Sequence, residues 1–239
     1  MNTIASNLTA VHARIAAAEA HYGRTPGSVQ LLAVSKGQPL PALLMALDAG
    51  QHSFGESYAQ EALHKINALR AAAPEWHYIG PLQRNKTRFV ATNFAWVHSL
   101  DRFMLAERLN AQRPAALPPL NICIEVNISG EPSKSGVDPA ALQELVAELA
   151  PLTRLRVRGL MALPAPAAGF DTQRDAFLLL RTLYDDLRAQ GYPLDTLSMG
   201  MSDDLEAAIA SGTTLVRVGT AIFGERMKAS GAGQEAGQF

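Results

Sequence analysis

Two hydrophobic rhythms alternate along this chain. Short apolar runs of strand length are separated by longer segments in which apolar residues recur at the spacing of an amphipathic helix. This alternation is typical of βα units that build a parallel sheet. The runs expected to form strands cover residues 29–35, 51–54, 75–79, 95–99, 120–127, 155–161, 195–199 and 213–218.

An additional helical stripe precedes the first of these runs. Ile4, Leu8, Val11 and Ile15 form it, and Gly23 follows as a C-terminal stop signal. Eight βα units after one extra helix predict an α/β fold, a closed (β/α)₈ TIM barrel with an extra N-terminal helix. A doubly wound open sheet is the alternative, because alternation alone does not show closure.

The sequence predicts one domain. Residues 1–228 contain all the expected strands, and the proline-containing stretch 163–169 is expected to be a surface loop of the same domain rather than a linker. Residues 229–239 are small and polar, so we expect a disordered C-terminal tail.

Charge, cysteine content and the first residues limit the partners and the compartment. The 21 basic and 22 acidic residues balance, which argues against nucleic acid or an anionic membrane as a partner. Cys123 is the only cysteine and lies in an apolar run, which predicts a buried, unreactive thiol. The N-terminus lacks a secretory pattern, so we expect a cytoplasmic protein. The expected outer helices show no apolar surplus, which favours a monomer or weak dimer.

Lys36 stands where the first strand run ends, just before Gly37. A lysine at the mouth of a parallel strand is partly desolvated and can lose its proton, and its amine can then attack a carbonyl to form a Schiff base. The alternative is an ordinary strand-end lysine that pairs with a nearby carboxylate. Whether Lys36 is a Schiff-base lysine or an ion-paired lysine depends on which residues stand at the other strand ends.

In a TIM barrel these strand ends meet at one rim, where active sites lie. The seventh run ends at Met199-Gly200-Met201-Ser202, and the eighth is followed by Gly219 and Thr220. Backbone amides at two adjacent helix starts, together with two hydroxyl groups, predict an anion-binding site. For Ser202, a simple helix N-cap is the alternative role.

Arg217 lies between Val216 and Val218, so alternation along the strand places its side chain on the opposite face from both valines. If the valines face the outer helices, the guanidinium enters the barrel, where it must have partners. The alternative is a structural ion pair with an interior carboxylate such as Glu125.

Other candidates carry less weight. Arg84, Lys86 and Arg88 are expected on a solvated helix face. His77 and His98 lie in strand runs and are expected to be core residues rather than metal ligands or bases, and the histidines lack metal-ligand spacing, so no metal site is expected. The chain contains no nucleophile elbow and no Walker-type loop.

A set of sequence blocks, in order from about residue 29 to 226, resembles the pyridoxal phosphate homeostasis proteins, which in bacteria are the YggS-type proteins. Any one block is weak, and all of them in order are highly specific. The blocks are Leu-Leu-Ala-Val-Ser-Lys-Gly, Phe-Gly-Glu-Ser-Tyr-Ala-Gln-Glu, Trp-His-Tyr-Ile-Gly-Pro-Leu-Gln-Arg-Asn-Lys, Ser-Lys-Ser-Gly, Arg-Gly-Leu-Met-Ala-Leu-Pro, Leu-Ser-Met-Gly-Met-Ser-Asp-Asp and Val-Arg-Val-Gly-Thr-Ala-Ile-Phe-Gly.

The resemblance implies a single barrel similar to the N-terminal domain of alanine racemase, with pyridoxal 5'-phosphate (PLP) as an internal aldimine on Lys36. It implies phosphate ligands at Ser202, Gly219 and Thr220, with Gly200 in the same cofactor-binding set. The partner of the pyridine nitrogen would be Arg217.

One position departs from the family pattern. The second block usually reads Phe-Gly-Glu-Asn, and here Ser57 replaces the asparagine. The shorter hydroxyl side chain puts a cofactor contact in doubt, and we keep Ser57 as a candidate cofactor-binding residue.

The resemblance implies a role in PLP (vitamin B6) homeostasis, and these residues favour a non-catalytic carrier for that role. A guanidinium donates a hydrogen bond to the ring nitrogen and opposes its protonation, which weakens the electron sink. Racemases of similar fold take a second acid/base tyrosine from a C-terminal domain, and we expect none in this chain. We therefore expect no catalytic residue, and apo PLP-dependent enzymes as recipients.

Two enzymatic alternatives remain: an amino-acid racemase or related PLP enzyme, and a Schiff-base aldolase that acts on a sugar phosphate. The sequence leaves open whether Lys134 offers a second binding or exit position for the cofactor.

Overall fold

A computed structural model describes residues 3–131 and 134–225, and in it the strands close into a barrel. All neighbouring strands are parallel and follow one another in chain order, and pairing of Gln30 with Leu215 joins the first strand to the last. The closed barrel is confirmed, and the open-sheet alternative is wrong. The strands are β1 (Gln30–Val34), β2 (Ser53–Glu56), β3 (Glu75–Tyr78), β4 (Trp96–Leu100), β5 (Leu120–Glu125), β6 (Leu155–Met161), β7 (Thr196–Ser198) and β8 (Leu215–Val218).

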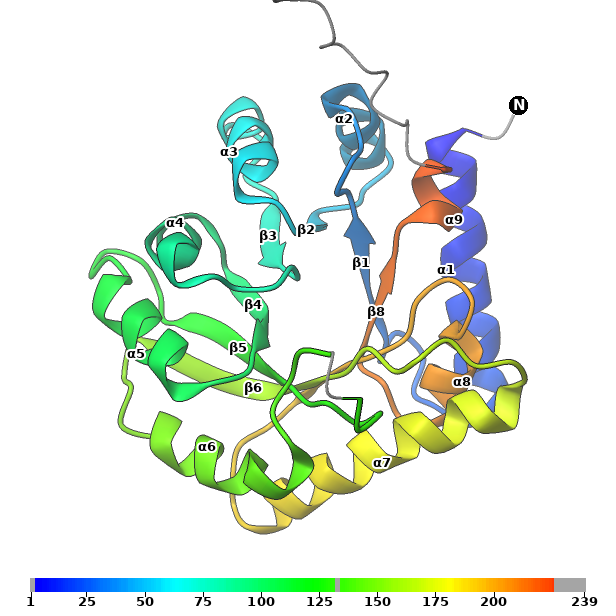
Figure 1. Ribbon diagram of the computed structural model, residues 1–239. Coiled ribbons are helices and arrows are strands. Elements are labelled where there is room, and N and C mark those ends of the chain that lie inside the picture. The colour runs from blue at the N-terminus through cyan, green and yellow to red at the C-terminus, as the bar shows by residue number, and fades with distance from the viewer. Residues whose placement is uncertain (1–2, 132–133, 226–239) are drawn as a thin grey trace, which may run out of the picture.

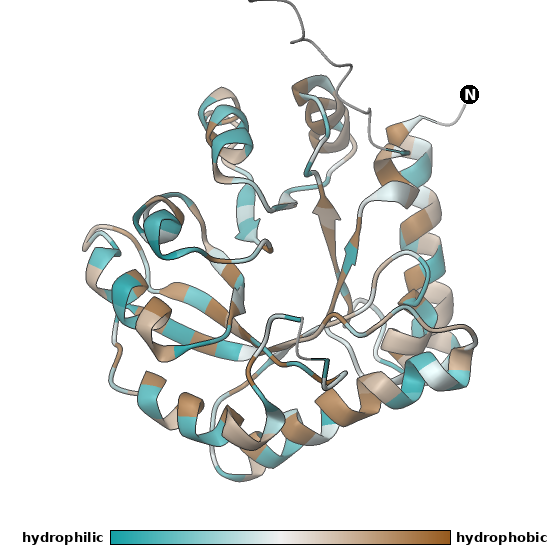
Figure 2. Ribbon diagram, in the orientation of Figure 1, coloured by the Kyte–Doolittle hydropathy of each residue, from teal (hydrophilic) through white to brown (hydrophobic). Residues whose placement is uncertain are grey.

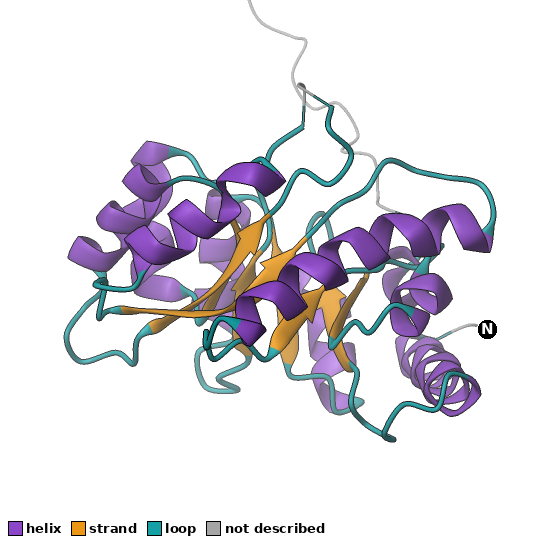
Figure 3. Ribbon diagram, turned by 90° about the horizontal axis from the view of Figure 1, so that it is seen from below, coloured by secondary structure: helices purple, strands orange, loops and turns teal. Residues whose placement is uncertain are grey.

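Helices surround the strands, as Figures 1 and 3 show. The extra N-terminal helix α1 is present: a capping box between Thr3 and Ser6 starts it, and it packs beside α8 and α9. The helices are α1 (Ile4–His21), α2 (Leu40–Asp48), α3 (Ala59–Ala68), α4 (Thr87–Asn93), α5 (Phe103–Gln112), α6 (Leu142–Leu149), α7 (Phe170–Ala189), α8 (Leu205–Ala210) and α9 (Thr220–Phe223), with short 3₁₀ turns η1 (Arg84–Lys86) and η2 (Pro139–Ala141).

The main hydrophobic core lies between the strands and the helices. Phe54, Ile122, Val216 and Val218 face outward into it and are fully buried. In Figure 2, most of β1 is apolar, although the strand begins at the exposed Gln30, whereas the helices mix apolar and polar positions. A barrel strand is covered on both faces and a surface helix on one.

The inside of the barrel has a different composition from this outer core. Its apolar part is a small separate cluster of Trp96, Cys123 and Met161. Buried polar side chains from β3, β4, β7 and β8 fill much of the remaining space, and each must find partners inside the barrel.

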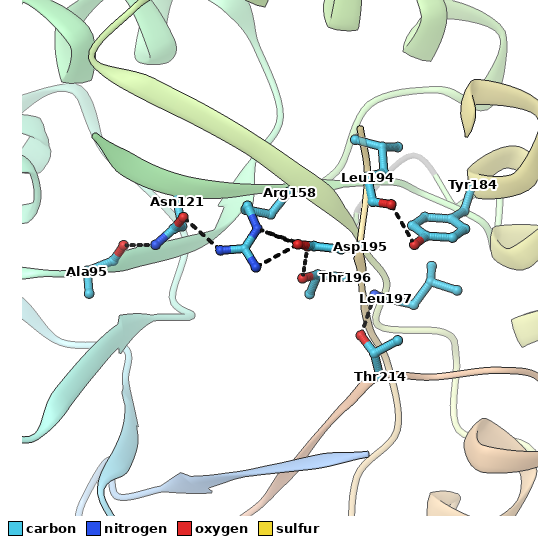
Figure 4. Close-up of polar contacts among 9 residues, drawn as sticks. All are labelled: Ala95, Asn121, Arg158, Tyr184, Leu194, Asp195, Thr196, Leu197 and Thr214. Atoms are coloured by element: carbon cyan, nitrogen blue, oxygen red, sulfur yellow. Dashed lines mark hydrogen bonds and ion pairs between the residues drawn. The ribbon is translucent and has the colours of Figure 1, made fainter. Parts of the chain in front are cut away.

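Arg158 braces the end of the barrel where the strands begin. Its guanidinium donates to both carboxylate oxygens of Asp195, with distances of 2.7 Å to 2.9 Å, and to Oδ1 of Asn121 at 3.0 Å (Figure 4). It also lies over the ring of Trp96, 4.8 Å from the centroid. These contacts tie β5, β6 and the start of β7 to the interior cluster.

The described part of the chain contains no helix long and apolar enough to cross a membrane. Residues 163–169 form the expected loop between β6 and α7. The expected tail, residues 229–239, lies outside the described residues.

Burial makes Cys123 testable as a marker of the closed barrel. The thiol is fully buried, and burial raises its pKa to about 12. We expect no reaction with a thiol-exchange reagent such as DTNB at pH 8, because the reactive thiolate does not form in the folded protein. One equivalent should react after unfolding in guanidinium chloride. Rapid reaction of the native protein would contradict this placement.

Candidate functional site

A pocket of about 500 Å³ opens at the rim formed by the carboxyl ends of the strands. Five of the residues that the sequence singled out line this pocket: Lys36, Ser202, Arg217, Gly219 and Thr220. Residues that lie far apart in the sequence therefore come together at one site. Apolar side chains, among them Val34, Ile79 and Met161, form the rest of its wall.

Lys36 is half-buried and belongs to the turn that follows β1. Gly37 has a φ of 74°, a left-handed conformation that glycine adopts at little cost, and so lets the chain turn away after the lysine. The backbone N–H of Gly37 donates to Oε1 of Glu61 at 2.6 Å, so α3 holds this turn in place.

A second lysine, which the sequence analysis did not single out, supports this turn from inside. Lys65 is 2% exposed, and its Nζ donates to the backbone oxygen of Ser35 at 2.7 Å and to Oε1 of Glu56 at 2.7 Å. It also pairs with Glu61 one helical turn away. The i, i+4 spacing of Glu61 and Lys65 was the available signal, but that spacing is usual on exposed helix faces.

Another part of the pocket wall, at the ends of β7 and β8, carries donor groups that suit an anion. Ser202 and Thr220 line it, and within the described residues neither hydroxyl group has a hydrogen-bond partner. Gly219 stands at the N-cap of α9, and the first N–H groups of a helix have no acceptor within it. The two hydroxyl groups and the backbone N–H groups at the start of α9 can together donate several hydrogen bonds to a phosphate.

Arg14 is a further pocket residue that the sequence analysis missed. It projects from α1, and its Nη2 donates to the backbone oxygen of Ser202 at 3.1 Å. It therefore adds a positive charge on the side where Ser202 and Thr220 lie. No local sequence signal could identify it, because its place depends on the packing of α1 against α8.

Ser202 does not cap a helix, so that alternative is wrong. Helix α8 begins at Leu205, and Asp204 occupies the N-cap position. The carboxylate of Asp204 accepts from the backbone N–H of Met201 and closes the preceding turn. Ser202 lies inside that turn, with its side chain on the pocket wall.

Arg217 enters the barrel, as strand alternation predicts, and forms the floor of the pocket. It is 4% exposed, and its Nη1 donates to the backbone oxygen and the Oγ of Ser198 at 2.6 Å and 2.7 Å. Its Nη2 donates to the backbone oxygen of Ala162 at 3.0 Å. These contacts, and not an ion pair with Glu125, hold the guanidinium. Burial lowers the pKa of Arg217 to about 10. This value is still well above neutral pH, so the guanidinium remains charged.

The other two candidates, Ser57 and Gly200, are not among the described residues that line the pocket. Ser57 is buried, and its Oγ has no hydrogen-bond partner in the described residues. Gly200 is also buried and has a φ of 95°; a Cβ there would lie 2.5 Å from that of Ala208. Gly200 therefore shapes the turn that carries Ser202, and Ser57 is a buried residue just after β2.

The remaining candidates lie elsewhere. Arg84 and Arg88 are exposed and Lys86 is half-buried, outside the pocket. His77 and His98 are buried inside the barrel, as expected of core residues. Across the described residues, no three His, Cys, Asp or Glu side chains gather in an arrangement that could hold a metal ion.

Lys134 lies at a neighbouring, smaller pocket of about 280 Å³, whose wall shares Ile79 and Leu163 with the larger one. Its Nζ is 3.0 Å from Oε1 of Glu131. Burial raises the pKa of Glu125, another residue of this smaller pocket, to about 7.

Taken together, the larger pocket offers a primary amine, a group of anion donors and a permanent cation on its floor. These groups match a flat molecule that carries an aldehyde, a phosphate and a ring nitrogen acceptor.

Comparisons with known proteins agree with this match. The model of the family described as alanine racemase, N-terminal domain, matches residues 6–227. The pyridoxal phosphate homeostasis protein of Escherichia coli K12 is 52% identical over 229 residues, which cover 95% of this chain and 98% of that protein. The protein of the same name from Pseudomonas aeruginosa is 54% identical over 226 residues, covering 95% and 97%.

Two solved structures are also similar to this chain. PipY of Synechococcus elongatus with PLP bound superposes with a TM-score of 0.82 at 36% identity, covering 93% of this chain and all (100%) of that one. Alanine racemase from Corynebacterium glutamicum has a TM-score of 0.66 at 18% identity and covers 96% of this chain and 62% of its own, a likeness of fold alone.

The buried Lys65 can be tested through stability. Replacing it by methionine leaves Glu56, whose side chain is fully buried, without its cation, and we expect a loss of about 3 kcal/mol in unfolding free energy at pH 8. Burial already raises the pKa of Glu56, and a raised carboxyl pKa means that protonation relieves the cost. The loss should therefore shrink as the pH falls toward 5. Urea unfolding at both pH values measures it.

Lys86→Met is the matched control for this substitution, because Lys86 lies at the surface turn η1 and should change stability by less than about 0.5 kcal/mol. An equal loss at pH 5 and pH 8 in Lys65→Met would show that Glu56 does not carry the effect.

Proposed function

Because the chain belongs to the pyridoxal phosphate homeostasis proteins, which have the alanine racemase N-terminal fold, we propose that it binds PLP and holds it as a Schiff base on Lys36. The observation that carries this proposal is the shared pocket of Lys36, Arg217 and the Ser202–Thr220 side. The amine takes the aldehyde carbon, the anion donors take the phosphate, and the guanidinium faces the ring nitrogen.

Arg217 supports a carrier rather than an enzyme. PLP stabilises a carbanion best when its ring nitrogen is protonated, and that state needs an acceptor or a negative charge beside it. A guanidinium is a donor without any acceptor and stays charged at neutral pH, so it stabilises the unprotonated nitrogen. The cofactor is then bound firmly but activated weakly.

The pocket wall supports the same conclusion. A racemase needs a second acid/base group across the substrate from the lysine. Among the described residues that line the pocket, Asp203 is the only carboxylate, and none is a tyrosine, histidine or cysteine. Asp203 is exposed, on the same side as Ser202. Apart from the exposed Asp203, the described residues of the pocket wall therefore offer no second acid/base group of the kind that a racemase needs.

We further propose that the protein acts in the cytoplasm as a monomer or weak dimer and gives up PLP to apo PLP-dependent enzymes. A Schiff base is reversible, so an attacking lysine of a recipient, or water, can release the cofactor from Lys36. Such a carrier keeps the reactive aldehyde bound until it is needed.

Spectroscopy tests the binding proposal. The protein incubated with PLP and freed of excess should show a visible Schiff-base absorbance, and borohydride reduction should fix the cofactor to the peptide that contains Lys36. Lys36→Ala should lose the band and the trapped adduct, because Lys36 is the only lysine among the described residues that line this pocket. Lys86→Ala, away from the pocket, should keep both. A trapped adduct on another lysine would overturn the assignment.

Turnover assays separate the carrier from the racemase. We expect no multiple-turnover racemisation of L- or D-amino acids by the loaded protein. Sustained turnover that disappears in Lys36→Ala would establish the racemase instead. A trapped adduct with a sugar phosphate in place of PLP would favour the aldolase.

A further inference from the structure

A continuous line of hydrogen-bonded side chains crosses the barrel interior from the pocket floor to the opposite opening. Nη1 of Arg217 donates to Oγ of Ser198 at 2.7 Å, and this oxygen lies 2.8 Å from Nδ1 of His98. Nε2 of His98 lies 2.9 Å from Nδ1 of His77, and Nε2 of His77 lies 2.9 Å from Oε1 of Glu75. The line joins β8, β7, β4 and β3.

The two ends of this line fix the direction of every hydrogen bond in it. A guanidinium can only donate, and an ionised carboxylate can only accept. Nε2 of His77 must therefore carry a hydrogen toward Glu75, which leaves Nδ1 of a neutral His77 as an acceptor. His98 then donates from Nε2, and its bare Nδ1 accepts the hydroxyl hydrogen of Ser198.

Burial supports the neutral state of both rings. Both histidines are buried, and burial lowers the pKa of His77 and places the pKa of His98 well below its usual value. The hydrogen bond from His77 lowers the pKa of Glu75, which keeps the carboxylate ionised at neutral pH. Each donor in the line therefore points away from the pocket.

Several neighbouring groups complete the surroundings of the line. Trp96 stacks on His77 with ring centroids 5.4 Å apart, and Arg158, on the face of Trp96, also lowers the pKa of Glu75. Near Arg217, the acidic groups that oppose the effect of burial on its pKa are chiefly Asp204 and then Glu125, since the Cys123 thiol stays protonated at neutral pH.

We propose that Ser198, His98, His77 and Glu75 are positioning residues for Arg217, and that their one-way line couples Glu75 at the base of the barrel to the cofactor ring. The role rests on the proposed PLP binding. The carboxylate polarises each bond in turn, so that the Ser198 oxygen becomes a stronger acceptor for Nη1. Arg217 is then held on the floor, with Nε–H and one Nη2–H not engaged by any described residue.

Glu75→Gln tests the coupling at a distance from the pocket. The glutamate side chain is 48% exposed, so its replacement should leave the fold intact. A carboxamide can donate or accept, so it no longer fixes the direction of the line. We expect PLP to bind about threefold more weakly and the pH titration of its visible band to shift. Ser198→Ala, which removes the acceptor itself, should weaken binding about tenfold.

Glu148→Gln is the matched control, because Glu148 is an exposed carboxylate on α6, outside the line. It should leave the affinity and the pH titration of the band as in the original protein. A pH titration of Glu75→Gln identical to that of the control would overturn the coupling, since a purely structural role predicts no change.

Nitrogen NMR of the protein without cofactor tests the line by itself. At pH 7, His77 and His98 should both be neutral and carry their hydrogen on Nε2, and Glu75→Gln should give mixed tautomers. A charged imidazole or an Nδ1–H form in the original protein would overturn the direction. Failure of the original protein to take up PLP would overturn the proposed function and, with it, the role of the line. Normal uptake with an unchanged titration would overturn only the role.

Discussion

The buried guanidinium of Arg217, which has no carboxylate partner among the described residues, is the constraint around which the interior of this barrel is organised. Removing the charge of Arg217 from water is costly, and this cost is offset by hydrogen bonds to Ser198 and to the backbone oxygen of Ala162, the residue that follows β6. Neutral acceptors leave the charge uncancelled. The pocket floor is therefore positively charged. A ligand that carries an acceptor nitrogen and a negatively charged phosphate suits such a floor.

The same constraint explains why the interior is polar while the outer core is apolar. Once Ser198 accepts from the guanidinium, its own hydrogen needs a partner, and a histidine inside the barrel provides it. Each donor along the line needs an acceptor in turn, and the last acceptor is Glu75, whose side chain is partly exposed to solvent at the base of the barrel. An apolar residue anywhere along this line would leave a buried polar group unsatisfied. The apolar residues of the outer core create no such demand, because their side chains carry no polar groups.

The two lysines near β1 have different roles: Lys65 stabilises the turn after the strand, and Lys36 supplies the amine that lines the pocket. Lys65 is fully enclosed and forms an ionic cluster with Glu56 and Glu61 that fixes the turn. Lys36, one residue beyond the backbone oxygen that Lys65 holds, projects into the pocket. A rigid turn limits the conformations of the Lys36 side chain before it binds, which lowers the entropic cost of a covalent bond there.

Much of the fold and part of the site could be predicted from local pattern alone. The order of strands and helices and the inward direction of Arg217 depend on periodicity, which a sequence shows directly. Contacts of Arg14, Lys65 and the histidine line depend on which elements become neighbours after the barrel closes. His77 and His98 illustrate the difference: each is a core residue by pattern, yet together they connect a surface carboxylate to the pocket floor. The two histidines form one hydrogen-bonded line only because closure of the barrel brings β3, β4, β7 and β8 together around its interior.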